Sequence, residues 1–80
     1  MKVEFTTHLD TSGLSCPEPV WMLHSAIRDA AVSDIIKVVA TDPATLRDIP
    51  QFCSFLGHSL LHQEQDDHAY IFFVQKGDKR

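Results

Sequence analysis

The chain has 80 residues, 44% of them hydrophobic, and 7 lysines and arginines against 11 aspartates and glutamates give it a net charge of −4. A chain this short is expected to form a single domain with a small core, so its chemistry is expected at the surface rather than in a deep cavity. The acidic balance disfavours direct nucleic-acid binding, which needs a basic surface, and favours protein partners.

The sequence shows no targeting or membrane-spanning segment. Its N-terminus has no apolar signal region, and no apolar run approaches the length of about 18 residues that a spanning helix needs. We therefore expect a cytoplasmic protein without membrane contact, and a monomer. In that compartment Cys16 and Cys53 are expected as reduced thiols rather than as a disulfide.

Hydrophobic patterning predicts a strand, a helix and a second strand in the first half of the chain. Val3 to Leu9 fit a strand, and Asp10 to Gly13 form a turn. A helix is predicted from Pro17 to Ala31, and β-branched residues predict a central strand from Ile35 to Ala40. The buried stripe of that helix is Val20, Leu23, Ile27 and Ala30/Ala31.

A second helix is predicted after a short turn at Ala44 to Arg47. Asp48 fits its N-cap, Pro50 its first turn and Gly57 its end. The apolar positions of this helix are Ile49, Phe52, Cys53, Phe55 and Leu56, which makes core packing the expected role of Cys53.

The last third of the chain predicts a hairpin. Ser59 to Gln65 and Tyr70 to Val74 fit two strands joined at Gln65 to His68, and Lys76 to Arg80 is expected to be a mobile polar tail. The predicted fold class is α/β (α+β) with the order β-α-β-α-β-β. Two helices are expected to cover one face of a four-stranded mixed sheet, which makes a two-layer sandwich.

One cysteine lies directly before the first predicted helix, in Cys16-Pro17-Glu18-Pro19. Because a proline keeps the preceding residue out of the helical conformation, Cys16 is expected at the N-cap or just before it. A helix N-terminus lowers a thiol pKa from about 8.5 to roughly 3.5–7.5. We therefore predict that Cys16 is exposed and forms a thiolate readily, against the alternative of a buried, inert thiol.

The neighbours of Cys16 are expected to support the thiol. Pro17 and Pro19 are chiefly helix-start residues, and their rigidity fixes the direction of the thiol. Glu18 is either a first-turn charge that favours the helix dipole or a contact to a partner.

Four further residues are candidates for partner docking. Trp21 lies off the predicted stripe, one turn from Cys16, and tryptophan is enriched in interface hot spots, although packing over the helix edge is an equal alternative. Arg28 and Arg47 suit acidic groups of a partner, against the default of surface charges without a role. Asp42 completes this candidate surface.

Three stretches of the chain resemble the TusA/SirA-like family of small sulfur carriers, and together they cover about half of it. They are Leu9-Asp-Thr-Ser-Gly-Leu-Ser-Cys-Pro-Glu-Pro19, Asp42-Pro-Ala-Thr45 and Arg47-Asp-Ile-Pro-Gln-Phe-Cys-Ser-Phe-Leu-Gly-His58. The resemblance implies a two-layer fold like the C-terminal domain of translation initiation factor three. It also implies that Cys16 is the sulfur-carrying cysteine, and that Cys53 is not.

The same resemblance implies the partners and the cargo. Cys16 would accept persulfide sulfur from a cysteine desulfurase and pass it to a downstream acceptor protein, which makes the chain a sulfurtransferase-type carrier rather than a stand-alone enzyme. The leading destination is 2-thiolation of the tRNA wobble uridine, because Arg47 to His58 is the stretch most similar to TusA. Molybdenum-cofactor synthesis and sulfur oxidation are alternatives.

Two other classes of function are alternatives to a carrier. A redox thiol protein predicts disulfide cycling with Cys53 or with a partner, and a regulatory domain predicts that Cys16→Ser keeps its function. The 5 histidines and 2 cysteines lack the spacings of a metal site, so neither a metal nor a bound cofactor is expected. Pyridoxal phosphate would belong to the donor desulfurase.

Overall fold

Four strands and two helices follow one another in the predicted order in a computed structural model that describes residues 4–78. The elements are β1 (Thr7–Thr11), α1 (Glu18–Asp29), β2 (Ile35–Ala40), α2 (Thr45–Leu56), β3 (Ser59–Gln65) and β4 (Tyr70–Gln75). The β-α-β-α-β-β order is thereby confirmed. Neither helix in the described part of the chain is long and apolar enough to cross a membrane.

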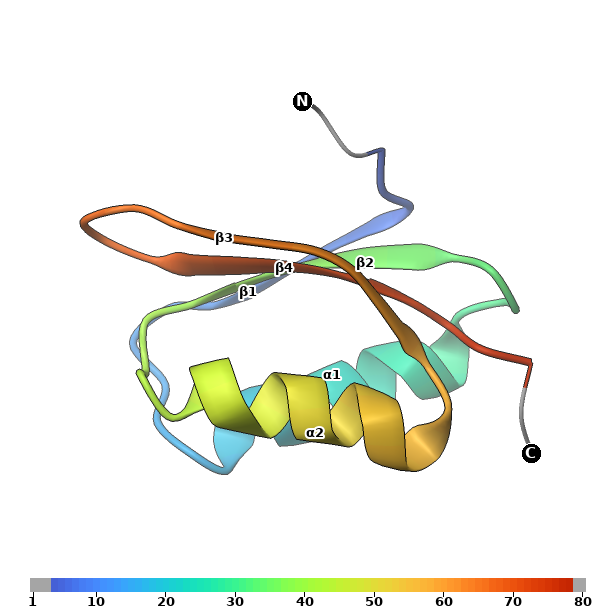
Figure 1. Cartoon of the computed structure of the whole chain (residues 1–80), viewed down its shortest axis with the longest axis horizontal. Helices are drawn as coiled ribbons and strands as arrows, with labels where there is room; N and C mark the ends of the chain where they lie inside the picture. The colour runs from blue at the N-terminus through green and yellow to red at the C-terminus, as the bar shows by residue number, and fades with distance from the viewer. Residues whose placement is uncertain (1–3, 79–80) are drawn as a thin grey trace.

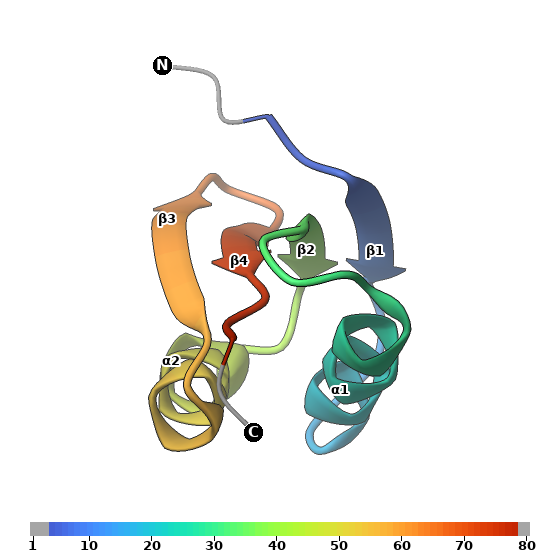
Figure 2. The ribbon, with the colours of Figure 1, turned by 90° about the vertical axis from the view of Figure 1, so that its right-hand side faces the viewer.

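The strands form one mixed sheet in the order β1-β2-β4-β3. β1 runs parallel to β2, whereas β4 is antiparallel to both of its neighbours. Both helices lie on the same side of the sheet (Figure 1). Figure 2 shows α1 below β1 and β2, and α2 below β3 and β4, in agreement with the contacts between these elements. The predicted two-layer sandwich is confirmed.

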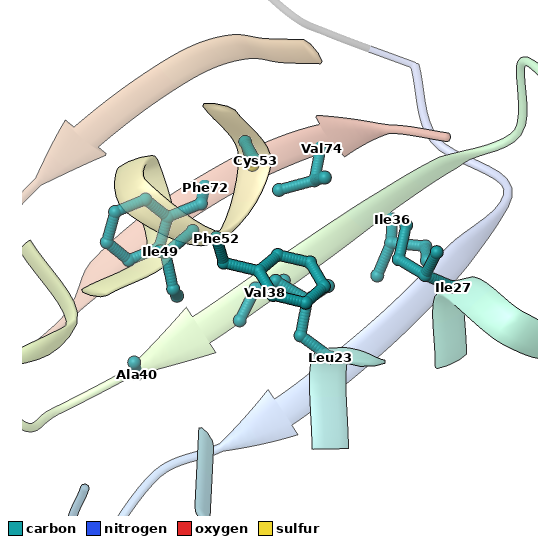
Figure 3. Packing of buried hydrophobic residues seen from close by; sticks show 10 residues of the cluster. All are labelled: Leu23, Ile27, Ile36, Val38, Ala40, Ile49, Phe52, Cys53, Phe72 and Val74. Carbon is teal, nitrogen blue, oxygen red and sulfur yellow. The ribbon is translucent and has the colours of Figure 1, made fainter. Parts of the chain in front are cut away.

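The core fills the space between the sheet and the two helices (Figure 3). Strand residues alternate between the two faces of a sheet, and the inward set on β2 pairs with that on β4, with Ile36 opposite Val74 and Val38 opposite Phe72. Leu23 of α1 and Ile49 of α2 are fully buried beneath them. Cys53 belongs to this cluster, which confirms its predicted packing role.

The first strand lies later in the chain than predicted, at Thr7–Thr11 rather than at Val3 to Leu9, and Val3 lies outside the described residues. Pairing with β2 decides the position, because Thr11 lies opposite Ala40 at the end of the ladder. The Thr11 hydroxyl is buried but donates to the Val39 carbonyl oxygen at 2.8 Å. The polar side chain therefore does not prevent burial.

The second helix begins at Thr45, so the prediction of Asp48 as its N-cap was wrong. Within the described residues no side chain caps α2, and the chain instead turns into the helix at Asp42, whose Oδ1 accepts from Ala44 N at 3.2 Å and whose carbonyl oxygen accepts from Thr45 N. Pro50 consequently lies inside α2 rather than in its first turn. Gly57 ends the helix in a left-handed conformation (φ 79°), as predicted. The first helix is also shorter than predicted, Glu18–Asp29.

The start of the predicted tail is tied to the fold. Lys76 Nζ donates to the Ala30 carbonyl oxygen, and Gly77 N donates to His58 Nδ1 at 2.9 Å. A side chain at Gly77 would overlap the Gly57 carbonyl oxygen, so the chain passes very close to the end of α2. Residues 76 and 77 are therefore anchored rather than free, and residues 79–80 lie outside the described part.

Candidate functional site

Cys16 lies in the connection between β1 and α1 and is exposed, as predicted. Pro17 takes the N-cap position of α1, so the cysteine stands just before the cap. The helix starts tightly here, because Glu18 N donates to the Ser15 carbonyl oxygen at 3.0 Å. Pro19 is buried and Glu18 is exposed, so the first turn of α1 holds the loop against the body of the protein.

Asp42 fixes the backbone at Cys16 from the other side. Its Oδ2 accepts a hydrogen bond from Cys16 N at 2.6 Å, while its Oδ1 accepts from Ala44 N. The side chain is half-buried. One carboxylate therefore joins the cysteine loop to the residue just before α2, and each of its oxygens has a partner within the chain.

The thiol itself is bonded to a second carboxylate. Cys16 Sγ donates to Asp48 Oδ2 at 3.0 Å, and Arg47 Nε lies 3.1 Å from the other oxygen of Asp48. The hydrogen bond to Asp48 raises the pKa of Cys16 above its ordinary value, with smaller contributions from burial and from the charge of Asp42. The same contact lowers the pKa of Asp48. The free protein therefore holds the sulfur as a neutral thiol.

The predicted activation of Cys16 by the helix N-terminus was wrong for the free protein. The positive end of a helix is carried by the unpaired N–H groups of its first turn. Pro17 and Pro19 have no N–H group, and that of Glu18 is bonded to Ser15. These three residues reduce the positive charge that faces the sulfur, whereas the Asp48 carboxylate accepts a hydrogen bond from it.

An apolar groove of about 570 Å³ opens beside the thiol, between α1 and α2. Trp21 and Phe55 stand in its walls with 67% and 88% of their surfaces exposed. Exposed aromatic side chains of this size are characteristic of interaction surfaces. The full lining is Cys16, Pro17, Val20, Trp21, Asp48, Gln51, Phe52, Ser54 and Phe55.

The structure brings most of the predicted site residues together. Asp42 touches Cys16, Arg47 touches the carboxylate that holds Cys16, and Trp21 shares the groove with it. Arg28 does not join them. It lies in the last turn of α1, about 15 Å along the helix from its first residue.

The second helix contributes site residues that the sequence prediction did not assign. The sequence predicts Asp48 as a helix cap and Phe55 as one of the apolar positions of the helix, whereas both line the groove. The spacing of Asp48, Gln51, Phe52 and Phe55 places them along one face of a helix, which is the pattern that would have shown them together. Because the sequence analysis placed the start of the helix at Asp48, it assigned Asp48 to the cap and not to this helix face.

Comparisons with known proteins agree with this geometry. The family model described as Sulfurtransferase TusA matches residues 7–76. The chain belongs to the TusA sulfurtransferase family. It is 53% identical to the sulfur carrier protein TusA of Pseudomonas putida (strain W619) over 68 residues. The matched segment is 85% of this chain and 85% of the other. It is also 53% identical to the TusA of Pseudomonas aeruginosa (strain LESB58), over 85% of this chain and 86% of the other.

The fold of this TusA-family chain is found in a solved structure. A SirA-like protein from Desulfitobacterium hafniense superposes with a TM-score of 0.78 over 91% of this chain and all of the other, at 16% sequence identity. That identity is low, so the match concerns the fold alone. It confirms the predicted SirA-like architecture.

The second cysteine of this TusA-family chain lies away from solvent. Cys53 is 2% exposed in the core, and burial raises the pKa of its thiol to about 11. A thiol in that state is inert at neutral pH. Among residues 4–78, no three histidine, cysteine, aspartate or glutamate side chains lie together in a way that would hold a metal ion.

Proposed function

We propose that Cys16 carries persulfide sulfur from a cysteine desulfurase to an acceptor protein. The observation that supports this most is the contrast between the two thiols. Cys16 is exposed beside an open apolar groove, whereas Cys53 is enclosed in the core. In a sulfurtransferase family, the sulfur that a partner protein can reach is the one suited to hold the cargo.

The transfer is a thiol exchange. Cys16 Sγ, once deprotonated, attacks the terminal sulfur of the donor persulfide and forms a new S–S bond. The old S–S bond of the donor breaks, and the donor cysteine leaves as a thiolate that takes up a proton. Cys16 then carries a persulfide, which is a reversible modification, and a second exchange delivers the sulfur to the acceptor.

The groove beside Cys16 is the docking surface in this proposal. Trp21 and Phe55 offer large exposed aromatic surfaces directly beside the reacting sulfur. Asp42 acts within the chain to position the cysteine loop, and Arg28 stands at the far end of α1. Docking therefore depends on the two aromatic side chains more than on Arg28.

We propose the tRNA wobble uridine as the final destination, with molybdenum-cofactor synthesis and sulfur oxidation as alternatives. The resemblance of the stretch from Arg47 to His58 to TusA supports this choice, and three exposed residues of that stretch, Gln51, Ser54 and Phe55, line the groove. Discrimination between acceptors would occur on this surface. The acidic net charge of −4 favours delivery through a protein acceptor rather than to RNA directly.

Complementation tests this function in a bacterium that lacks its own TusA. The wild-type chain and Cys53→Ser are expected to restore 2-thiouridine in tRNA, measured by mass spectrometry of nucleosides, and Cys16→Ser is expected to fail. Restoration of molybdoenzyme activity without 2-thiouridine would move the destination to the molybdenum cofactor. Full function of Cys16→Ser would instead support the regulatory-domain alternative.

A redox cycle within the chain has less support. It would need Cys16 to form a disulfide with Cys53, but Cys53 is packed among core residues and its thiol pKa is raised to about 11. A redox role would therefore need the thiol of another protein. Persulfide transfer requires only the exposed Cys16.

A further inference from the structure

We propose that Asp48 is a proton latch on Cys16: its carboxylate holds the sulfur as a neutral thiol in the free carrier and restrains its reactivity until a partner docks. The inference deepens the proposed function and rests on it for the identity of the electrophile. The reactivity of Cys16 itself can be measured without any sulfur donor.

The latch is defined by two contacts on the same carboxylate. Oδ2 of Asp48 accepts from Cys16 Sγ at 3.0 Å, and Oδ1 is held by Arg47 Nε at 3.1 Å. The Asp48 side chain is 18% exposed, and it stands in the first turn of α2. The carboxylate is therefore aimed at the sulfur by the backbone of α2 and steadied by the guanidinium.

The charges around the sulfur favour its neutral form. Asp48 and Arg47 face Cys16 from α2, Asp42 faces it from the β2–α2 connection, and Glu18 lies in the first turn of α1. Carboxylates destabilise a nearby thiolate by like-charge repulsion, while the arginine acts in the opposite direction. The direction of the Cys16 pKa, above its ordinary value, agrees with this balance.

The latch must open for sulfur to be transferred. Attack on a persulfide needs the thiolate, so the S–H proton leaves Cys16 before the new S–S bond forms. After loading, Sγ carries the transferred sulfur instead of hydrogen and no longer donates to Asp48. A cationic group of a partner that pairs with Asp48 would weaken its hold on the proton. Docking and activation are thereby coupled at one carboxylate.

The test measures the pH profile of Cys16 reactivity in a Cys53→Ser background. The probe is dithiodipyridine, a disulfide without charge near neutral pH, so that the charge of a variant does not attract or repel it. Asp48→Asn is expected to move the midpoint to lower pH. A tenfold gain in thiolate gives only about a threefold gain in exchange rate, because nucleophilicity falls with pKa. A gain of about threefold is expected at neutral pH.

Two further variants keep the test decisive. Arg47→Gln removes the cation, so its midpoint is expected to move to higher pH and its rate to fall. Arg47 is largely exposed, so this change does not threaten folding. Asp67→Asn makes the same chemical change as Asp48→Asn in the exposed β3–β4 connection, and its profile is expected to match the parent.

Opposite shifts for Asp48→Asn and Arg47→Gln would establish the latch, since general damage to the loop would move both variants alike. An unchanged or higher midpoint in Asp48→Asn would overturn it, as would shifts in the same direction. Sulfur loading of the wild-type chain is measured separately by intact mass. Loading with an unchanged Asp48→Asn profile refutes the latch alone, and opposite shifts without loading refute the carrier function alone.

Discussion

Asp42 Oδ2 accepts a hydrogen bond from the backbone N of Cys16 at 2.6 Å, across 26 positions of sequence. The other oxygen of the same carboxylate accepts from Ala44 N, just before α2. The loop that carries the reactive sulfur and the helix that carries Asp48 are thus held by one side chain. This contact explains how an exposed loop keeps Cys16 within hydrogen-bond distance of Asp48.

Removing that side chain is expected to loosen the site and to weaken the fold. A hydrogen bond to a charged group contributes about 1.5–3 kcal/mol, so Asp42→Ala is expected to lower the free energy of unfolding by about that amount. Urea denaturation measures the change, and Asp67→Ala is the control. An Asp42→Ala protein as stable as the wild type would show that the contact does not hold the loop.

Cys53 is expected to stay unmodified while the chain is folded. It is 2% exposed and its pKa is raised to about 11, so at neutral pH it is both enclosed and protonated. Iodoacetamide should therefore add one label in buffer, mapped to Cys16, and two in urea. Native labelling of Cys53 at a rate similar to that of Cys16 would contradict the described core.

Leu23 is expected to be a principal contributor to stability. It is fully buried between α1 and the sheet, and truncation of such a residue leaves a cavity. Leu23→Ala should cost about 2–5 kcal/mol in urea denaturation. Leu61, on β3, is 45% exposed, and its change to alanine should cost no more than about 0.5 kcal/mol. Similar costs for the two variants would be inconsistent with this core.

Trp21 is expected to be an anchor for the sulfur donor. It is 67% exposed in the groove wall, so Trp21→Ala should leave the fold intact. A hot-spot tryptophan contributes about 2 kcal/mol or more, so the Kd for a cysteine desulfurase, measured by calorimetry, should rise about 30-fold. Val32→Ala, at an exposed site after α1, is the control. Equal affinities for both variants would place the docking surface elsewhere.

His58 is expected to make stability depend on pH. Its Nδ1 accepts from Gly77 N, and burial, followed by the charges of Lys76 and His24, lowers its pKa below the ordinary 6.5. The unfolded chain therefore binds the proton more readily than the native one. It follows that the contribution of His58 is complete above pH 6.5 and decreases as pH falls from there towards the lowered native pKa.

Urea midpoints measured from neutral pH down to about pH 5 test this dependence, because the ordinary titration of histidine falls within that range. The wild type should lose stability across it, and His58→Gln should lose less. His68→Gln, in the exposed β3–β4 connection, should behave as the wild type. If the urea midpoints of wild type and His58→Gln changed equally with pH, His58 would not be the source of the pH dependence.

The elements that local pattern decides were predicted well. Ile35–Ala40 has the predicted bounds because its β-branched residues favour a strand locally, and Gly57 ends α2 because glycine readily adopts the left-handed conformation. Ser59–Gln65 also has the predicted bounds. The start of α2 was mispredicted because, three residues before Thr45, the chain already turns into the helix at Asp42, whose side-chain and carbonyl oxygens accept from Ala44 N and Thr45 N. β1 was misplaced because its register depends on β2, which is distant in sequence.

The sequence predicted the position and exposure of Cys16 correctly, but not the charges that surround its thiol. Cys16 and Trp21 are exposed where the sequence placed them, next to the first turn of α1. The state of the thiol depends on Asp48, which is 32 positions away in sequence and reaches the sulfur only through the packing of two helices. The residues next to Cys16 in the sequence therefore could not predict that contact.

The most direct test of the account is the intact mass of the reduced protein after incubation with a cysteine desulfurase and cysteine, followed by peptide mapping. If Cys16 is the sulfur carrier, the protein gains the mass of one sulfur atom, located on Cys16, and this gain is present in Cys53→Ser and absent in Cys16→Ser. No added sulfur, or sulfur distributed equally between Cys16 and Cys53, would contradict it.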